Sequence, residues 1–281
     1  MTDDVFAALW DEAEARWRRH TEVLDWSPDY RIRGTETDWL ARDEYAHFAH
    51  WLEYALAGAR SRLQGGPPPA PIADENAQND AWAAEDRALT EEEARRRCTS
   101  IRQDYIDLIR GLPEERRNER VAAAVRSGLV AHFDTHFGYM VAGMLSDEAA
   151  SWQRLTAALD ARPSEVLHTG DDGRPWRAAD IYAHVERWMT VNIPRAEAGL
   201  ATGVVPELEA SADDLNARWL AEDAGVTFEA ARRRSFVARE AFMAQMRGIG
   251  IPQWTARLVS LYAGNAWGHY AEHLEYMEHA G

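Results

Sequence analysis

Residues 39–51 read WLARDEYAHFAHW, and residues 176–188 read WRAADIYAHVERW. The two stretches lie 137 residues apart and share the pattern Trp-x3-Asp-x-Tyr-Ala-His-x3-Trp. The same shift holds without a gap from residue 39 to residue 140, and 31 of these 102 aligned positions are identical. Self-similarity over such a length indicates that the chain carries a tandem duplication of one structural unit.

Both copies carry apolar residues at helical spacing, separated by stop signals such as Gly65-Gly66-Pro67. Thr90, followed by Glu93, has the spacing of a capping box at a helix start. No stretch of five residues alternates between apolar and polar side chains as a half-buried strand would. Helices are predicted over about 5–24, 40–63, 74–84, 90–110 and 120–141, and in the second copy over about 147–160, 177–200, 211–222, 227–247 and 254–278.

The predicted fold class is therefore all-α, with a four-helix bundle in each copy and a long crossover after its second helix. The boundary between the copies is expected near Gly143, where a helix stop precedes a new N-cap at Ser146-Asp147. This divides the chain into domains 1–143 and 144–281. The pair is expected to form a pseudo-dimer within a monomeric chain.

The composition excludes several classes of function. The 281 residues hold 47 acidic and 31 basic residues, a net charge of −16, and every basic residue is arginine. Without lysine there is no Schiff-base or P-loop lysine, and the negative charge argues against nucleic acid as a partner. The single cysteine, Cys98, cannot form an internal disulfide. With no signal peptide or membrane span in the pattern, a cytoplasmic protein acting on a small molecule is expected.

Six of the ten histidines recur at the common shift. Each copy has a His-x3-His pair, which places two imidazoles on one helix face, and a third histidine 85 residues before that pair. Three imidazoles converging from facing helices can bind one divalent ion and leave a position open for water or substrate. The predicted metal ligands are His47, His132 and His136 in the first copy, and His184, His269 and His273 in the second.

Two residue types flank the third histidine in both copies. Asp43 and Asp180 lie one turn before it, and they are expected either to accept its spare ring N–H or to interact with the helix N-terminus. Trp51 and Trp188 lie one turn after it, and they are expected either to wall a pocket or to stack on a substrate.

Other repeated positions have simpler interpretations. The runs 95–97 and 232–234 are all arginine and are expected to be solvated helix faces, or alternatively to supply a carboxylate clamp at a pocket rim. The pairs Asn79 with Trp82 and Asn216 with Trp219 are expected to fasten the crossover to the bundle. Cys98 aligns with Ser235, so a buried, inert thiol is expected.

The Trp-x3-Asp-x-Tyr-Ala-His-x3-Trp pattern, followed about 80 residues later by His-x3-His, resembles the DinB/YfiT-like superfamily of bacterial four-helix bundles. The second copy matches at Trp176, Asp180, His184, Trp188, Asn265, His269, Tyr270 and His273. The first copy departs from the pattern at Gly128 and Phe133, where the second has Asn265 and Tyr270. The stretch around Asn216 and Trp219 also resembles the branch that contains the colibactin self-resistance protein.

The resemblance implies a divalent metal, zinc or nickel, held by the three histidines of each copy. It also implies transfer of a low-molecular-weight thiol such as mycothiol to an electrophile, or hydrolysis, with Trp51, Trp188 and Tyr270 as substrate-binding candidates. The self-resistance branch implies an alternative, a metal-independent protein that detoxifies a reactive natural product. A third alternative is a non-catalytic, stress-associated binding bundle.

Overall fold

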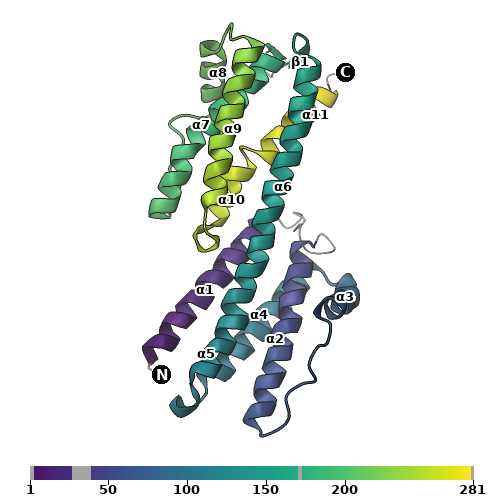
Figure 1. The fold of residues 1–281 in the computed structure, drawn as a ribbon, viewed down its shortest axis with the longest axis vertical. Coiled ribbons are helices and arrows are strands. Elements are labelled where there is room, and N and C mark those ends of the chain that lie inside the picture. The colour runs from purple at the N-terminus through teal and green to yellow at the C-terminus, as the bar shows by residue number, and fades with distance from the viewer. Residues whose placement is uncertain (1–2, 27–38, 170–172, 280–281) are drawn as a thin grey trace. The chain divides into compact units, whose positions relative to one another are not determined.

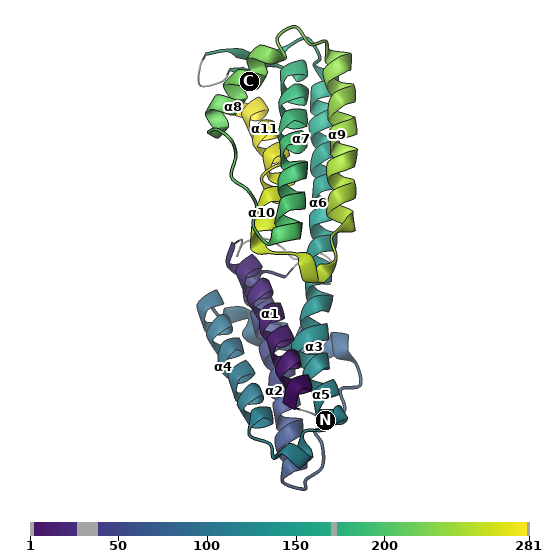
Figure 2. The ribbon, with the colours of Figure 1, turned by 90° about the vertical axis from the view of Figure 1, so that its left-hand side faces the viewer.

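The computed structural model describes residues 3–26, 39–169 and 173–279 (Figures 1 and 2). The chain divides into two compact units, Met1–Val141 and Ala142–Gly281, here called the first and second unit. The described residues are mostly helical, with two short strands, which confirms the all-α fold class. None of the described helices is both long enough and apolar enough to cross a membrane.

In the first unit, long helices run alongside one another and enclose an apolar core (Figure 2). Its helices are α1 (Asp3–Trp26), α2 (Ala41–Leu63), α3 (Glu75–Glu85), α4 (Glu91–Arg110), α5 (Glu119–Arg126) and the start of α6 (His132–Ala161), with a π-helical turn at Ser127–Ala131 before α6. The predicted capping box opens α4, since Thr90 Oγ1 accepts from the Glu93 backbone N–H and the Glu93 carboxylate accepts from that of Thr90.

The second unit repeats this arrangement from the remainder of α6 onward. Its elements are β1 (Val166–Thr169), β2 (Pro175–Arg177), α7 (Ala178–Thr202), α8 (Ala212–Glu222), α9 (Phe228–Gly248), α10 (Ala256–Ala263) and α11 (Trp267–His279). Helix α7 packs along α9 as α2 packs along α4. Ser211 caps α8 and Thr227 caps α9 by accepting from backbone N–H groups three residues on.

The predicted helix stop at Gly143 is wrong, because α6 continues unbroken from His132 to Ala161. An isolated glycine inside a helix costs only about 1 kcal/mol, and helix-forming residues surround this one. Gly143 is not among the described glycines with positive φ, so it does not have the conformation that ends a helix. The boundary between the two units therefore falls after Val141 in the sequence, within the residues of α6.

Two further features were not predicted. Strands β1 and β2 form a short antiparallel hairpin before α7, and at four and three residues they are too short to produce a recognisable alternation. The predicted helix over 254–278 is divided into α10 and α11 at residues 264–266. Gly264 and Asn265 lie at this break, and Asn265 Nδ2 donates to the Leu261 carbonyl oxygen, which holds the interrupted turn.

Matching contacts relate the two units residue by residue. Tyr45 Oη donates to Asp25 at 3.3 Å, and Tyr182 Oη donates to Asp160 at 2.8 Å. Tyr45 and Tyr182 are 137 positions apart, whereas Asp25 and Asp160 are 135 apart. The helix that begins each unit is therefore equivalent at a shift of 135, at which Trp17 and Trp152 also correspond.

Candidate metal centre

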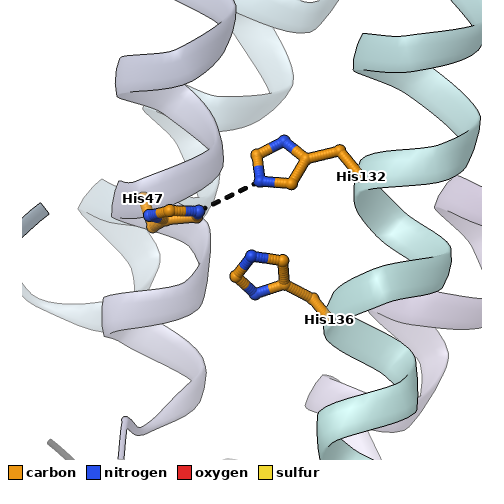
Figure 3. Close-up of side chains that lie close together, drawn as sticks. All are labelled: His47, His132 and His136. Carbon is orange, nitrogen blue, oxygen red and sulfur yellow. Dashed lines mark hydrogen bonds between the residues drawn. The ribbon is translucent and has the colours of Figure 1, made fainter. Parts of the chain in front are cut away.

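In the first unit, three histidines from two helices point toward one another (Figure 3). His47 lies on α2, and His132 and His136 lie one turn apart at the start of α6; together they are called the first triad. The Nε2 atoms of His47 and His132 are 3.1 Å apart. One nitrogen from each ring lies within 4.8 Å of the other two.

The second unit repeats this geometry with His184 on α7 and His269 and His273 on α11, called the second triad. The Nε2 atom of His269 lies 2.9 Å from that of His184 and 3.2 Å from that of His273. The structure thus brings together all six histidines singled out by the sequence, in two groups of three that could each hold a metal ion.

The donor set fits a divalent ion such as zinc. Tetrahedral zinc bound by imidazole nitrogens at about 2.0–2.1 Å separates those nitrogens by roughly 3.3 Å. The Nε2 separations of 2.9–3.2 Å are close to this value. In the second triad the Nδ1 atoms of His269 and His273 are buried without a hydrogen-bond partner in the described part of the chain, so Nε2 is the atom that each ring presents to the group.

Burial favours the neutral form of five of the six triad imidazoles, and the neutral form is the one that binds metal. Burial and the neighbouring histidines lower the pKa of His47 to about 2, and burial lowers that of His132 to about 3 and that of His269 to about 4. The pKa values of His184 and His273 are also lowered well below the usual value, first by burial and then by neighbouring histidines. Proton competition for these nitrogens is therefore weak at neutral pH.

An irregular helical turn precedes the His-x3-His pair in both units. The π-helical turn Ser127–Ala131 comes directly before His132, and the break at residues 264–266 comes shortly before His269. Positions 127–131 align with 264–268 at the shift of 137. Such a turn changes the direction in which the following side chains project, and π-helical turns are frequent at functional sites.

A buried carboxylate lies behind the first triad, and the sequence analysis missed it. Both Glu44 oxygens contact His136 Nδ1, at 2.9 and 3.1 Å, and Oε1 lies 3.3 Å from Nε2 of His20. Glu44 and His20 are fully buried. Burial alone would raise the pKa of Glu44, but its interactions with His136 and His20 outweigh the effect of burial and lower the pKa. The sequence does contain one indication that Glu44 is buried. It aligns with Ile181, an apolar residue that is typical of a core position.

In the second unit, apolar residues occupy the positions that correspond to Glu44 and His20. Ile181 and Leu155 are fully buried at the positions that correspond to Glu44 and His20. His168, on β1, instead stacks on Trp176 with ring centroids 5.3 Å apart, and its centroid is 6.2 Å from that of His273. The two triads share their ligand geometry but differ in what surrounds them.

Asp43 and Asp180 interact with helix N-termini. Asp43 Oδ2 accepts from the Leu40 backbone N–H at 3.0 Å, and Asp180 Oδ2 accepts from that of Arg177 at 2.8 Å. Two roles were expected for these carboxylates: accepting a histidine N–H, or interacting with the helix N-terminus. The hydrogen bonds show the second role, and the helix dipole favours a negative charge at that end of the helix.

Trp51 and Trp188 attach the short crossover helices, α3 and α8, to the helices that carry His47 and His184. Trp51 Nε1 donates to Asn79 on α3 at 3.1 Å, and Trp188 Nε1 donates to Asn216 on α8 at 2.9 Å. Trp188 also packs edge-on against Trp219, with ring centroids 5.1 Å apart. These contacts confirm that the Asn and Trp pairs fasten the crossover.

A pocket opens beside the second triad. It is a shallow hollow that is partly open to solvent, and it reaches the half-buried ring of His184. It is lined by Trp176, Asp180, Ala183, His184, Asn216, Trp219, Leu220 and Asp223. A small molecule at this position would contact the side chains of Trp176, Trp219 and His184.

Tyr270, implied as a substrate-binding residue, is instead a core residue. It is fully buried, its hydroxyl contacts the Met189 sulfur at 3.5 Å, and it does not line the pocket. Burial raises its pKa well above the usual value. Cys98 is also fully buried, which confirms the predicted burial, and burial raises the pKa of its thiol, which favours an unreactive thiol.

The arginine runs bind carboxylates of the chain itself. Arg97 contacts Glu53 and Asp86, and Arg234 contacts Glu186 and Asp223. Asp86 and Asp223 are equivalent at the shift of 137, whereas Glu53 and Glu186 are not. Arg96 pairs with Glu92 one turn away, as expected for a solvated face. The third arginine of each run is therefore paired with carboxylates of the chain, and one of these carboxylates, Asp223, lines the pocket beside His184.

Comparison of the chain with protein-family models, with curated proteins and with solved structures gave no match.

Proposed function

We propose that the chain is a metal-dependent enzyme in which each triad holds one divalent ion, zinc or nickel, and in which a thiol or water is activated against an electrophilic small molecule. The single observation that carries the proposal is the presence of two groups of three histidines, in each of which the ligand nitrogens lie within 4.8 Å. The fold proposed to support it is a tandem pair of DinB-like four-helix bundles that form a pseudo-dimer within one chain.

The number of ligands supports a catalytic rather than a structural role. Structural zinc sites use four protein ligands, whereas three ligands leave a position for a reactant. Each described group contains three metal-binding side chains and no cysteine or carboxylate as a fourth. A divalent ion at such a position supplies a Lewis acid that lowers the pKa of a thiol or water bound there.

The chain's own residues have distinct tasks in this proposal. Histidines of both triads, such as His47, His184 and His269, would offer neutral lone pairs, because burial lowers their pKa values. Trp176 and Trp219 form apolar walls of the pocket at His184, where they would orient a small substrate and limit access of water. No lysine and no reactive cysteine is available to act as a covalent nucleophile.

The open position can be tested with cobalt as a spectroscopic substitute for zinc. We expect that adding glutathione or mercaptoethanol to the Co²⁺-substituted chain produces a thiolate-to-cobalt charge-transfer band. His184→Ala combined with His47→Ala should abolish this band. A Co²⁺-substituted chain whose spectrum is unchanged by thiols, by azide and by other small anions has no open position, which would contradict the proposed catalysis.

The dependence of catalytic activity on metal provides a second test. Transfer of a thiol to a haloarene or an epoxide, or hydrolysis of an activated ester, should require added zinc or nickel and should be lost on chelation. Activity that survives both chelation and removal of the triad histidines would instead support the metal-independent detoxification protein.

A further inference from the structure

The first triad differs from the second in one buried charged group. Glu44 lies on α2 between His136 of the triad and His20 of α1, and its side chain is fully buried. Its two oxygens contact His136 Nδ1 at 2.9 and 3.1 Å. Figure 3 shows the other ring nitrogen of His136 on the side that faces His47 and His132.

This contact fixes the chemical form of the His136 ring. A carboxylate only accepts hydrogen bonds, so His136 Nδ1 donates its hydrogen to Glu44 and Nε2 carries the lone pair. A metal-binding imidazole that donates its second N–H to a carboxylate is held in orientation and becomes a more basic ligand. The first triad is therefore prearranged for a cation before any ion binds.

The second triad lacks both effects. Ile181 is buried at the position of Glu44, and Leu155 is buried at the position of His20. The Nδ1 atoms of His269 and His273 are buried with no hydrogen-bond partner among the described residues. In the second triad the charge of Glu272 acts on His269, but no carboxylate among the described residues bonds to Nδ1 of His269 or His273. In the first triad the negative charge of the buried Glu44 touches His136 directly and would attract an ion more strongly.

We infer that Glu44 is a positioning residue that makes the first triad bind a divalent ion roughly 10- to 100-fold more tightly than the second, an inference that rests on the proposed metal-binding role of both triads. The second triad, beside the pocket at His184, then holds the ion that exchanges more readily.

Two full-length chains with one triad each test this directly. One carries His184→Ala and His269→Ala and keeps the first triad; the other carries His47→Ala and His132→Ala and keeps the second. Their Zn²⁺ affinities are measured by competition with a chromophoric chelator. The first-triad chain should bind roughly 10- to 100-fold more tightly. Equal affinities, or tighter binding by the second-triad chain, would overturn the inference.

Glu44→Gln then isolates the carboxylate. In this variant the side-chain amide oxygen can still accept a hydrogen bond from His136 Nδ1, but the negative charge of the carboxylate is lost. In the first-triad chain we expect the Zn²⁺ affinity to fall roughly 10- to 100-fold, and in the second-triad chain, the matched control, we expect no change. An unchanged affinity in the first-triad chain would refute the role of Glu44. Folding of Glu44→Gln is checked by circular dichroism. If this variant does not fold, the comparison of the two single-triad chains still shows whether the first triad binds Zn²⁺ more tightly than the second.

A spectroscopic measurement separates this role from a purely structural one. With Co²⁺ in the first-triad chain, Glu44→Gln should shift the visible absorption band to longer wavelength, because His136 becomes a weaker donor. A loss of packing alone would lower occupancy without moving the band. If neither single-triad chain nor the full chain binds Zn²⁺, the proposed function itself fails; if both triads bind equally, only this inference fails.

Discussion

His184 and His269 are separated by 85 residues in the chain, yet their Nε2 atoms lie 2.9 Å apart. His47 and His132, also 85 residues apart, bring the same atoms to 3.1 Å in the other unit. About two-thirds of the aligned positions differ between the copies, and the neighbours of the two triads differ as well. That this geometry persists against such divergence is the reason to treat the triads as functional, and the predictions below depend on it.

Replacing one histidine of a triad should remove one ion. His269→Gln takes away one of three ligands, so the Zn²⁺ content should fall from two ions per chain to one. The matched control is His50→Gln, which alters a buried histidine that contacts Asp86 rather than a triad. Position 50 aligns with Arg187, which also pairs with an aspartate, so it tolerates another donor. Equal metal content in both variants would contradict the assignment of His269 as a ligand.

The metal-free chain should lose stability in mild acid. Burial lowers the pKa of His269 to about 4, below the unfolded value of about 6.5, so the unfolded chain binds more protons between these pH values. The free energy of unfolding should therefore decrease as the pH falls from 6.5 toward 4, on the order of 1.4 kcal/mol per pH unit for each such histidine. Urea unfolding between pH 7.5 and 4.5 measures this.

A shallower pH dependence is expected for His269→Gln, because one such histidine is gone. A wild-type stability that stays constant between pH 7 and 5 would show that the triad imidazoles are not held neutral by burial.

Cys98 should be unreactive in the folded chain. The thiol is fully buried and its pKa is raised by burial, so a chromogenic disulfide reagent should modify no thiol until urea unfolds the protein. Cys98→Ser should cost less than about 1.5 kcal/mol, because the aligned residue Ser235 is also buried and donates to the Arg232 carbonyl at 2.8 Å. Rapid modification of the native chain would mean that α4 opens readily around Cys98.

The hydrogen bond between Trp188 and Asn216 should stabilise the crossover helix. Asn216→Ala leaves the indole N–H of a largely buried tryptophan without its acceptor, at a cost of about 1–3 kcal/mol in unfolding free energy. Asn216→Asp keeps an acceptor oxygen and should cost less. Asn79→Ala should also cost less, because Trp51 is only half-buried. Urea unfolding of the three variants should rank them in this way, and an equal effect of all three would count against the interaction.

The repeat made the ligand sets predictable from sequence. His-x3-His fixes two rings on one helix face by local geometry alone, and the common 85-residue spacing identified the third ring in each copy. The helix ends at Thr90 and Thr227 were predictable for the same reason, since a cap needs only a few neighbouring residues.

Glu44 and Gly143 show where such reasoning fails. Glu44 looks like a surface residue in a helical pattern, and its burial depends on His20, which another helix supplies from 24 positions earlier. Gly143 has the residue type of a helix stop, but whether a helix ends there depends on the packing of the segments on either side. Both outcomes are tertiary effects that local patterns do not contain.

The most direct test of the central claim is the metal content of the chain. The full-length protein, purified without a histidine tag, is incubated with excess Zn²⁺, freed of unbound ion, and measured by inductively coupled plasma mass spectrometry. We predict two zinc ions per chain, one for each triad. A chain that retains no zinc under these conditions would contradict the proposal that the triads are metal sites.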